Sequence, residues 1–289
     1  MFDISKHNII RSKSNATIVS LAKIGSDKKY RDNDKMYAAE GVKLFCEAVR
    51  FGADVRKVLI CEDFAVNING VPANENAARA LSEAMAAGAE IIVASSDVFM
   101  KVTGEMSPQG IIAYIGYDGA RHKKIPSSAA ADGAFADDGE LVMMLESVRD
   151  PSNLGAIMRC ACALGYGSLI LTDNCADIYN PKTLRASMGA VFKLKTFAFE
   201  SSSHVAESVK KSGRRLIAAR LDDTAHEADR GFFKRSDCVV IGNEGHGISR
   251  ELAAMCNTSV YIPISADTES LNAASASSII MWEQSRSSL

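Results

Sequence analysis

The chain has 289 residues, of which 47% are apolar and 24% charged, and its formal net charge is −2 at pH 7. This length is enough for two domains with cores of their own, and the composition is that of an ordinary soluble globular protein. No apolar run approaches the roughly 18 residues that cross a bilayer, and a near-neutral charge excludes a protein that is basic over its whole surface.

Cysteine and histidine usage points to a reducing compartment. The seven cysteines include no C-x-x-C pair, and several lie in apolar segments, so we expect reduced thiols. The first 13 residues lack the apolar core of a signal peptide, and the five histidines are scattered, so no metal site is expected. These features predict a cytoplasmic protein without a membrane segment or a metal.

Basic side chains are concentrated in three stretches. Residues 6–35 hold eight basic against three acidic side chains, residues 178–199 hold four basic and residues 210–220 five, the last two stretches without an acid. Such patches attract phosphate backbones while the rest of the surface stays near neutral. Solvated helix faces are the alternative for any one of them.

The first half is predicted to be a compact α/β unit. Periodicity predicts a helix over 35–53, whose apolar stripe is Val42, Phe45, Ala48 and Val49. Further elements are predicted in the order strand 55–62, a helix from 76 to Gly88, strand 90–95 and strand 110–117. Residues 117–139 are small, polar and glycine-bearing, the composition of a linker. We therefore divide the chain into domains 1–116 and 140–289.

The second half begins with an apolar strand over 140–148, followed by an amphipathic helix. Its stripe is formed by Ile157, Cys160, Ala161 and Leu164, at i, i+3, i+4 and i+7. Ser152 or Asn153 is the expected N-cap, and Gly165 is expected to end the helix. Further strands are predicted over 168–172, 194–199, 215–220, 238–243 and 259–264, and a last helix begins near Ser270.

This alternation predicts a parallel sheet with helices on both faces. Ligands of such sheets bind beyond the carboxyl ends of the strands, which points to the loops 146–153, 172–181, 242–248 and 263–270. One of them, 242–248, lies within the run VVIGNEGHGIS (residues 239–249). Its glycines read G-x-x-G-x-G, which is not the G-x-G-x-x-G of a dinucleotide site, so a nicotinamide-dependent oxidoreductase ranks last.

Four motifs occur in order along the second half: N-L-G-x-I-x-R (Asn153 to Arg159), R-A-S-M-G-A (Arg185 to Ala190), I-G-N-E-G-x-G-I-S (Ile241 to Ser249) and I-P-I…S-L-N-A-A-S-A (Ile262 to Ala276). Together they resemble the SpoU/TrmH family of RNA ribose 2′-O-methyltransferases, which belongs to the wider SPOUT group. The first half more loosely resembles the accessory RNA-binding domain of that family, with Glu40-Gly41 at the usual place.

The resemblance implies an α/β fold in which a C-terminal SPOUT domain with a parallel sheet forms a trefoil knot, preceded by a smaller α/β RNA-binding domain. It also implies S-adenosyl-L-methionine as cofactor, a homodimer, and structured RNA as substrate, with rRNA ranked first and tRNA kept as the alternative. The residues that match its cofactor site are Gly242, Asn243, Gly245, Gly247, Ile262, Leu271 and Ala274.

The resemblance places catalysis on Asn153, Arg159, Glu244, Ser270 and Asn272. The resemblance gives Arg159 the role of the base. A guanidinium keeps its proton in proteins, so Arg159 could instead stabilise negative charge on the substrate, and both roles stay open. Glu244 is expected to pair with Arg159 or to accept amide hydrogens in the glycine loop.

Asn153, Ser270 and Asn272 could also serve as helix caps, and capping is compatible with catalysis. A non-catalytic RNA-binding or ribosome assembly protein that has kept the knotted fold is the alternative function.

Overall fold

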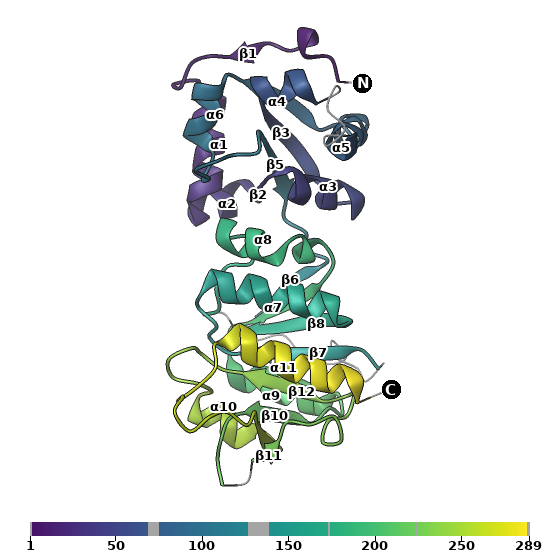
Figure 1. Cartoon of the computed structure of the whole chain (residues 1–289), viewed down its shortest axis with the longest axis vertical. Coiled ribbons are helices and arrows are strands. Elements are labelled where there is room, and N and C mark those ends of the chain that lie inside the picture. Colours follow the sequence, from purple (N-terminus) through teal and green to yellow (C-terminus); the bar gives the residue numbers. More distant parts are fainter. Residues whose placement is uncertain (1, 69–74, 127–138, 173, 224, 288–289) are drawn as a thin grey trace. The chain divides into compact units, whose positions relative to one another are not determined.

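A computed structural model of the chain describes residues 2–68, 75–126, 139–172, 174–223 and 225–287 (Figure 1). The chain forms two compact units. The first contains the residues up to Asp118 together with Tyr179–Phe192, and the second contains Gly119–Ile178 and Lys193–Leu289. The predicted division at 117–139 did not anticipate that residues 179–192 group with the first unit. Among the described residues, no helix is both long and apolar enough to cross a membrane.

The first unit is a five-stranded sheet covered by helices. Its strands are β1 (Ile9–Ile10), β2 (Met36–Glu40), β3 (Val55–Cys61), β4 (Glu90–Ala94) and β5 (Ile111–Gly116). Its helices are η1 (Ile4–Lys6), α1 (Ala16–Ser26), α2 (Lys28–Asp34), α3 (Val42–Arg50), α4 (Glu62–Asn67), α5 (Glu75–Ala86), α6 (Ser96–Val102), α8 (Pro181–Ser187) and η3 (Ala190–Phe192).

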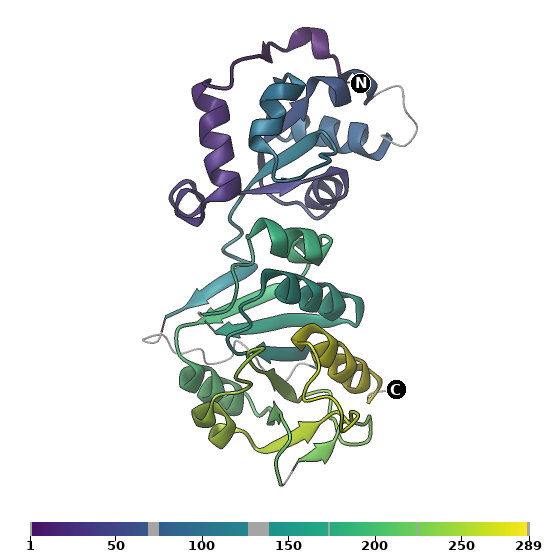
Figure 2. The ribbon, with the colours of Figure 1, turned by 60° about the vertical axis from the view of Figure 1, so that its left-hand side comes forward.

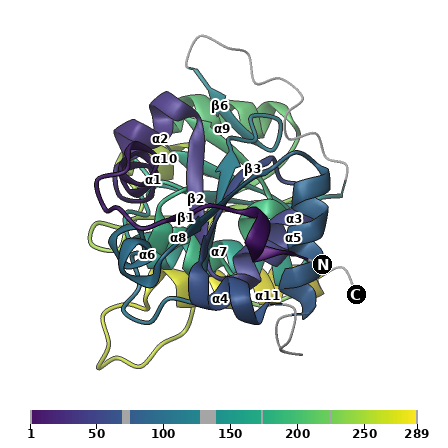
Figure 3. The same ribbon diagram turned by 90° about the horizontal axis from the view of Figure 1, so that it is seen from above.

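The strand order in this unit is β1-β4-β3-β5-β2. Helices α1 and α6 pack together on one face of the sheet, and α3 and α5 pack together on the other (Figure 3). Residues 179–192 are held here because α8 packs on β2 and the Tyr179 ring stacks between Tyr37 and Tyr117, with both centroid separations 4.3 Å.

The helix predicted over 35–53 begins only at Val42, and this prediction was wrong for its first third. Met36–Glu40 is a strand because it pairs antiparallel with β5, from Met36 opposite Gly116 to Glu40 opposite Ile112. Gly41 separates strand from helix with a φ of +105°, a value that glycine adopts without steric cost. The four residues of the predicted apolar stripe all lie in α3, which begins after Gly41.

The second unit is built on an eight-stranded sheet. Its strands are β6 (His122–Ile125), β7 (Leu141–Leu145), β8 (Tyr166–Thr172), β9 (Lys195–Phe199), β10 (Leu216–Ala219), β11 (His226–Glu227), β12 (Cys238–Ile241) and β13 (Thr258–Tyr261). Its helices are α7 (Pro151–Ala163), α9 (Ser202–Lys211), α10 (Arg250–Met255) and α11 (Ala273–Arg286). Strand β6 lies within the predicted linker, of which residues 127–138 lie outside the described residues.

All pairings in this sheet are parallel, in the order β11-β13-β10-β12-β7-β8-β9-β6, which confirms the predicted parallel sheet. Helices α7 and α11 pack together on one face, and α9 and α10 on the other (Figure 2). Because both faces are covered, the central strands are apolar along their whole length. All five residues of β7 are buried.

Two helix boundaries in this unit differ from prediction. Helix α7 is capped by Asp150, whose carboxylate accepts from the Asn153 N–H at 2.8 Å, and not by Ser152 or Asn153. Pro151 follows as the first helical residue, where a missing N–H costs nothing. Helix α11 begins at Ala273 because Asn272, not Ser270, caps it. Gly165 ends α7 with a φ of +79°, as expected.

Candidate functional site

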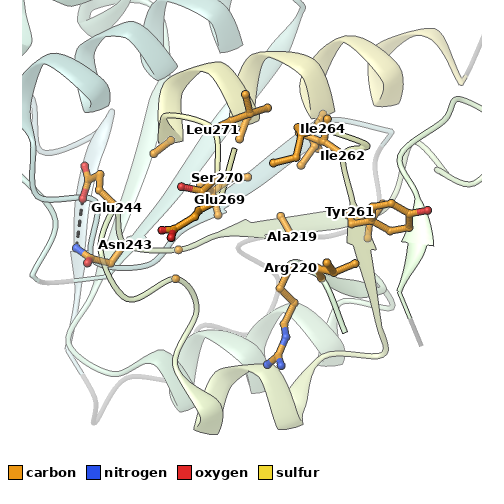
Figure 4. A pocket seen from close by; sticks show the side chains of 18 of the residues that line it. Ala219, Arg220, Asn243, Glu244, Tyr261, Ile262, Ile264, Glu269, Ser270 and Leu271 are labelled. Carbon is orange, nitrogen blue, oxygen red and sulfur yellow. Dashed lines mark hydrogen bonds between the residues drawn. The ribbon is translucent and has the colours of Figure 1, made fainter. Parts of the chain in front are cut away.

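A pocket of about 530 Å³ lies at the carboxyl ends of β10, β12 and β13, where a ligand site was expected (Figure 4). One wall is the glycine loop after β12, and another is the segment from Tyr261 to Leu271 that leads into α11. The lining includes six residues predicted for the cofactor, namely Gly242, Asn243, Gly245, Gly247, Ile262 and Leu271. Of the α11 residues, Ala273 and Ala276 line it but Ala274 does not.

The glycine loop is a small closed hairpin. The Asn243 N–H donates to the Gly247 carbonyl at 3.0 Å, and the Gly247 N–H donates back to Asn243 at 2.9 Å. The Asn243 side-chain oxygen accepts from the N–H groups of Gly245 and His246 at 3.0 and 3.1 Å. Its amide nitrogen donates to the Ser147 carbonyl at 2.8 Å, so Asn243 both shapes the loop and ties it to the end of β7.

The three glycines of the loop differ in how strongly the backbone requires them. A Cβ on Gly242 would overlap the backbone of Gly247 and Ile248. Gly247 has open space around it but a φ of +67°, where a side chain is strained. Gly245 has a negative or extended φ, and a Cβ there would meet only Asn243 Oδ1, at 3.6 Å. The fold itself therefore demands glycine at 242 and favours it at 247.

Glu244 connects the glycine loop to the first turn of α7. Its carboxylate accepts from the N–H groups of Arg149 and Asp150 at 3.3 and 3.2 Å, and from the Asn153 side-chain amide at 3.1 Å. Partial burial raises the pKa of Glu244, but hydrogen bonds from Asn153, from its own N–H, and from Asp150 and Arg149 outweigh burial and lower the pKa below its ordinary value of 4.5. Glu244 is therefore ionised at neutral pH.

Asn153 is the centre of this network. While its amide nitrogen donates to Glu244, its side-chain oxygen accepts from the Asn272 amide at 2.9 Å. Asn272 in turn caps α11, accepting from the N–H groups of Ala274 and Ser275 at 2.9 and 3.3 Å. The starts of α7 and α11 and the glycine loop are thus fixed to one another by side chains 91 and 119 residues apart in sequence.

Comparison of the chain with known proteins identifies the family to which it belongs. The model of the SpoU rRNA Methylase family matches residues 140–282, and that of the MRM3-like substrate binding domain matches residues 15–113. A tRNA/rRNA methyltransferase of Synechocystis, described as uncharacterized, is 30% identical over 204 residues, which cover 70% of this chain and 69% of that protein. The chain belongs to the SpoU rRNA methylase family.

Two further similarities extend over nearly the whole SpoU chain. The 23S rRNA (guanosine(2553)-2′-O)-methyltransferase RlmP of Bacillus subtilis is 26% identical over 273 residues, covering 94% of this chain and 97% of that protein. The AdoMet-bound structure of an rRNA methyltransferase from Sinorhizobium meliloti has a TM-score of 0.78 at 24% identity, with 98% and 99% of the two chains covered. That structure shares the fold, and the predicted family is confirmed.

Three of the five residues predicted to be catalytic in this SpoU domain are joined by hydrogen bonds: Asn153, Glu244 and Asn272. Ser270 is exposed and lines the pocket beside Glu269 (Figure 4). Arg159 is exposed on α7. It lies six residues beyond Asn153, about 9 Å along the helix axis at 1.5 Å per residue. Glu244 accepts from the side-chain amide of Asn243 in the glycine loop at 3.2 Å, as one of the two expectations had it (Figure 4). Its other hydrogen bonds are with the start of α7 and not with Arg159.

Sequence reasoning missed one buried carboxylate. Glu146 is 5% exposed and accepts from the Ser249 N–H at 2.8 Å, the Ser249 hydroxyl at 2.7 Å and the Ser202 hydroxyl at 3.0 Å. It thereby fixes the far end of the glycine loop and the starts of α9 and α10. The sequence did contain a signal for this role, because Glu146 directly follows an apolar strand. A carboxylate that is buried in such a place needs hydrogen-bond donors around it.

Two charged residues that line the pocket were also missed, Arg220 and Glu269. Arg220 pairs with Asp222 at 3.2 Å, and its guanidinium points away from Ser270 and Leu271 (Figure 4). The Glu269 carboxylate points toward the glycine loop (Figure 4). Both residues lie in stretches singled out above, Glu269 in a loop after a strand and Arg220 in a basic cluster.

Proposed function

We propose that this SpoU protein transfers a methyl group from S-adenosyl-L-methionine to a ribose 2′-hydroxyl of ribosomal RNA. The observation that carries the proposal is the hydrogen-bonded set Glu244–Asn153–Asn272 at the edge of a pocket in a SpoU domain. These side chains come from three separate motifs, and a chain that only bound RNA through this fold would have no need to join them. Known relatives with rRNA 2′-O-methyltransferase names support the same substrate class.

The residues around the pocket fit such a cofactor. About 530 Å³ lies within the roughly 300–1,000 Å³ of small-molecule sites. The glycine loop offers bare backbone to an adenosyl group, and Ile262 and Leu271 line the opposite side. The cofactor is a cation at its sulfonium and ammonium groups, and the carboxylates of Glu244 and Glu269 suit that charge.

The chemistry needs little from the protein beyond alignment. The sulfonium supplies an already activated methyl group. The 2′-oxygen would bond to the methyl carbon as the carbon–sulfur bond breaks and S-adenosylhomocysteine leaves, and the hydroxyl proton would pass to solvent water. The chain has to hold the 2′-oxygen in line for this step, and such alignment alone can supply roughly 7–11 kcal/mol. We assign that role to Ser270 and Asn272, with Glu244 and Asn153 holding the helix start in place. Arg159 keeps its proton and stabilises negative charge on the substrate, which needs no deprotonation.

We also propose that the protein is a homodimer and that its C-terminal segment is threaded into a trefoil knot. An apolar pair on α11 supports the dimer, since Ile279 and Trp282 lie one turn apart and are 37% and 50% exposed. The segment after β13 supports the knot, because it lines the same pocket as the glycine loop before it leads into α11. Light scattering coupled to size exclusion tests the dimer, and Trp282→Glu is expected to give a monomer. We further propose a cytoplasmic location, which the free cysteines would suit.

The proposal is tested with tritiated S-adenosylmethionine and RNA from cells that lack this gene, followed by mapping of the labelled nucleotide. We expect one labelled ribose in rRNA. Arg159→Ala should abolish labelling and leave circular dichroism unchanged. Arg79→Ala is the matched control, since Arg79 lies on α5 and pairs with Glu83, and it should label normally.

Labelling near wild type in Arg159→Ala would remove Arg159 from the mechanism. Wild-type protein that neither labels RNA nor binds S-adenosylmethionine at millimolar concentration would establish the non-catalytic alternative.

A further inference from the structure

A second cavity, of about 420 Å³, lies wholly within the first unit and shares no residue with the pocket above. Its lining residues come from α1, β2, α3, the end of α6 with the loop after it, β5 and α8. Its interior is apolar, lined by the buried side chains of Leu44, Val102, Ile112 and Leu184 and by the half-buried Val19, Ala22 and Ala38. We call it the α1–α8 recess.

The one carboxylate among the lining residues, that of Glu40, is already engaged. One of its oxygens accepts from the Thr103 hydroxyl, and the other from the Gly104 N–H at 3.1 Å. These bonds tie the loop after α6 to the end of β2. Glu40 therefore has a structural role at the recess, and its carboxylate is not available to bind a cation there.

The rim of the recess is cationic. Lys23 and Lys101 are exposed on the packed helices α1 and α6, and both line it. Lys23 donates to the Tyr30 hydroxyl at 3.0 Å, and Lys101 donates to the Lys13 carbonyl at 2.7 Å. Within the described part of the chain, neither has a carboxylate at ion-pair distance, so both positive charges remain uncompensated.

Arg185 completes the rim from α8. Its guanidinium pairs with Glu105 at 2.6 Å, which leaves part of its five-donor fork for another acceptor. An apolar recess with cations at its mouth matches an unstacked nucleotide, whose base is flat and apolar on its faces and whose phosphate is anionic. Proteins that read folded RNA take up such splayed bases from loops and bulges, while phosphates fix the register.

We propose that the α1–α8 recess binds an unpaired base of the RNA substrate, with Lys23 and Lys101 on the flanking phosphates. The inference rests on the proposed function in one respect, namely that the substrate is RNA. It assigns to the first unit a base-binding site separate from the pocket where the methyl group is transferred.

The test uses full-length protein and fluorescence anisotropy with two labelled probes, a mixed-sequence 12-nucleotide single-stranded RNA and an abasic 12-mer with the same sugar–phosphate backbone. Ala22→Phe fills the recess and should weaken binding of the RNA by about 5- to 150-fold, the loss of one stacked base. Binding of the abasic strand should not change. Ala78→Phe makes the same substitution on α5, on the other face of the sheet, and should bind both probes normally.

The rim is tested with the double variant Lys23→Ala/Lys101→Ala. Loss of two phosphate contacts on a single strand should make the slope of log K against log salt shallower by about 1.4, with both probes weakened. The matched control is Lys6→Ala/Lys57→Ala, which removes the same charge from lysines paired with Asp3 and Glu90, and its slope should equal that of the wild type.

Wild-type RNA affinity and salt slope in Ala22→Phe and in the rim variant would overturn the proposal. So would displacement of the RNA by a polyglutamate peptide at equal concentration, since the recess would then serve an acidic protein. If the wild type methylates rRNA while these variants bind like wild type, only this inference fails. If the wild type methylates no RNA, the proposed function fails, and the two probes still decide what the recess binds.

Discussion

Substituting Gly242 by alanine should disrupt the glycine loop more than any other single methyl group added to it. The added Cβ would overlap the backbone of Gly247 and Ile248, which cannot move aside as a flexible side chain would. The overlap is relieved only if the hairpin opens. Opening breaks the two backbone hydrogen bonds between Asn243 and Gly247.

The expected cost follows from those two bonds. At about 0.5–1.5 kcal/mol net for each, the free energy of unfolding should fall by about 1–3 kcal/mol. For a unit of this size that corresponds to a fall in Tm of roughly 2–12 °C. Because the same hairpin is one wall of the pocket, S-adenosylmethionine should bind at least about tenfold more weakly, a change of only about 1.4 kcal/mol.

Two measurements check this prediction. The protein has one tryptophan, Trp282 on α11, so its fluorescence in urea reports unfolding of the second unit. Titration calorimetry gives the cofactor affinity. Gly245→Ala is the matched control, since its Cβ would meet only Asn243 Oδ1 at 3.6 Å, and its stability should stay within about 0.5 kcal/mol of the wild type. Equal stability of the 242 and 245 variants would refute the steric reasoning.

Three further predictions concern the carboxylates and their partners. The pKa of Glu244 is lowered in the fold, so its ionised carboxylate contributes fully to the free energy of unfolding above its ordinary pKa of 4.5. That contribution is lost as the pH falls through the pKa of the folded state. The difference in unfolding free energy between wild type and Glu244→Gln should therefore be constant from about pH 7 to 5 and shrink below about pH 5, and a constant difference down to about pH 3 would contradict this. Asn153→Asp keeps an acceptor for Asn272 but places a second carboxylate beside that of Glu244. Labelling of RNA should therefore fall at pH 7 and partly recover toward pH 5 as one of the two carboxylates becomes protonated. A decline toward pH 5 parallel to that of the wild type would count against the hydrogen-bonded set Glu244–Asn153–Asn272. Glu146→Ala removes the buried acceptor of Ser249 and should cost about 1.5–3 kcal/mol in urea unfolding, and a cost below 0.5 kcal/mol would show that water replaces it.

Much of the second unit could be predicted because its strands are buried on both faces. Parallel strands covered on both sides are continuous apolar runs, and β7, β8, β10 and β12 could be located on that basis. Their alternation with helices predicted the parallel sheet. Because ligands of such sheets bind beyond the carboxyl ends of the strands, the edge where the pocket lies could also be predicted. The motifs then named eight of the residues that line it, six for the cofactor together with Glu244 and Ser270.

What could not be predicted depends on contacts far apart in sequence. Met36–Glu40 continues the helical period of α3, and only its pairing with β5 makes it a strand. Glu244 accepts an amide hydrogen within the glycine loop, as expected, but its bonds to the start of α7 were not foreseen, because they depend on the end of β12 lying beside that of β7. Glu146 and the grouping of residues 179–192 with the first unit have the same origin. Hydrophobic periodicity shows which face of a helix or strand is buried, but it does not show which other element packs against that face.

The grouping of Tyr179–Phe192 with the first unit has a consequence for how this protein can be divided. The polypeptide passes between the two units after Asp118, Ile178 and Phe192, so no single cut yields two self-sufficient fragments. A fragment beginning at Gly119 would carry Tyr179 and α8 without the rings of Tyr37 and Tyr117 that cover them, and would expose that aromatic surface. Exchange of the N-terminal half between relatives would succeed only if a short segment encoded far downstream were exchanged with it.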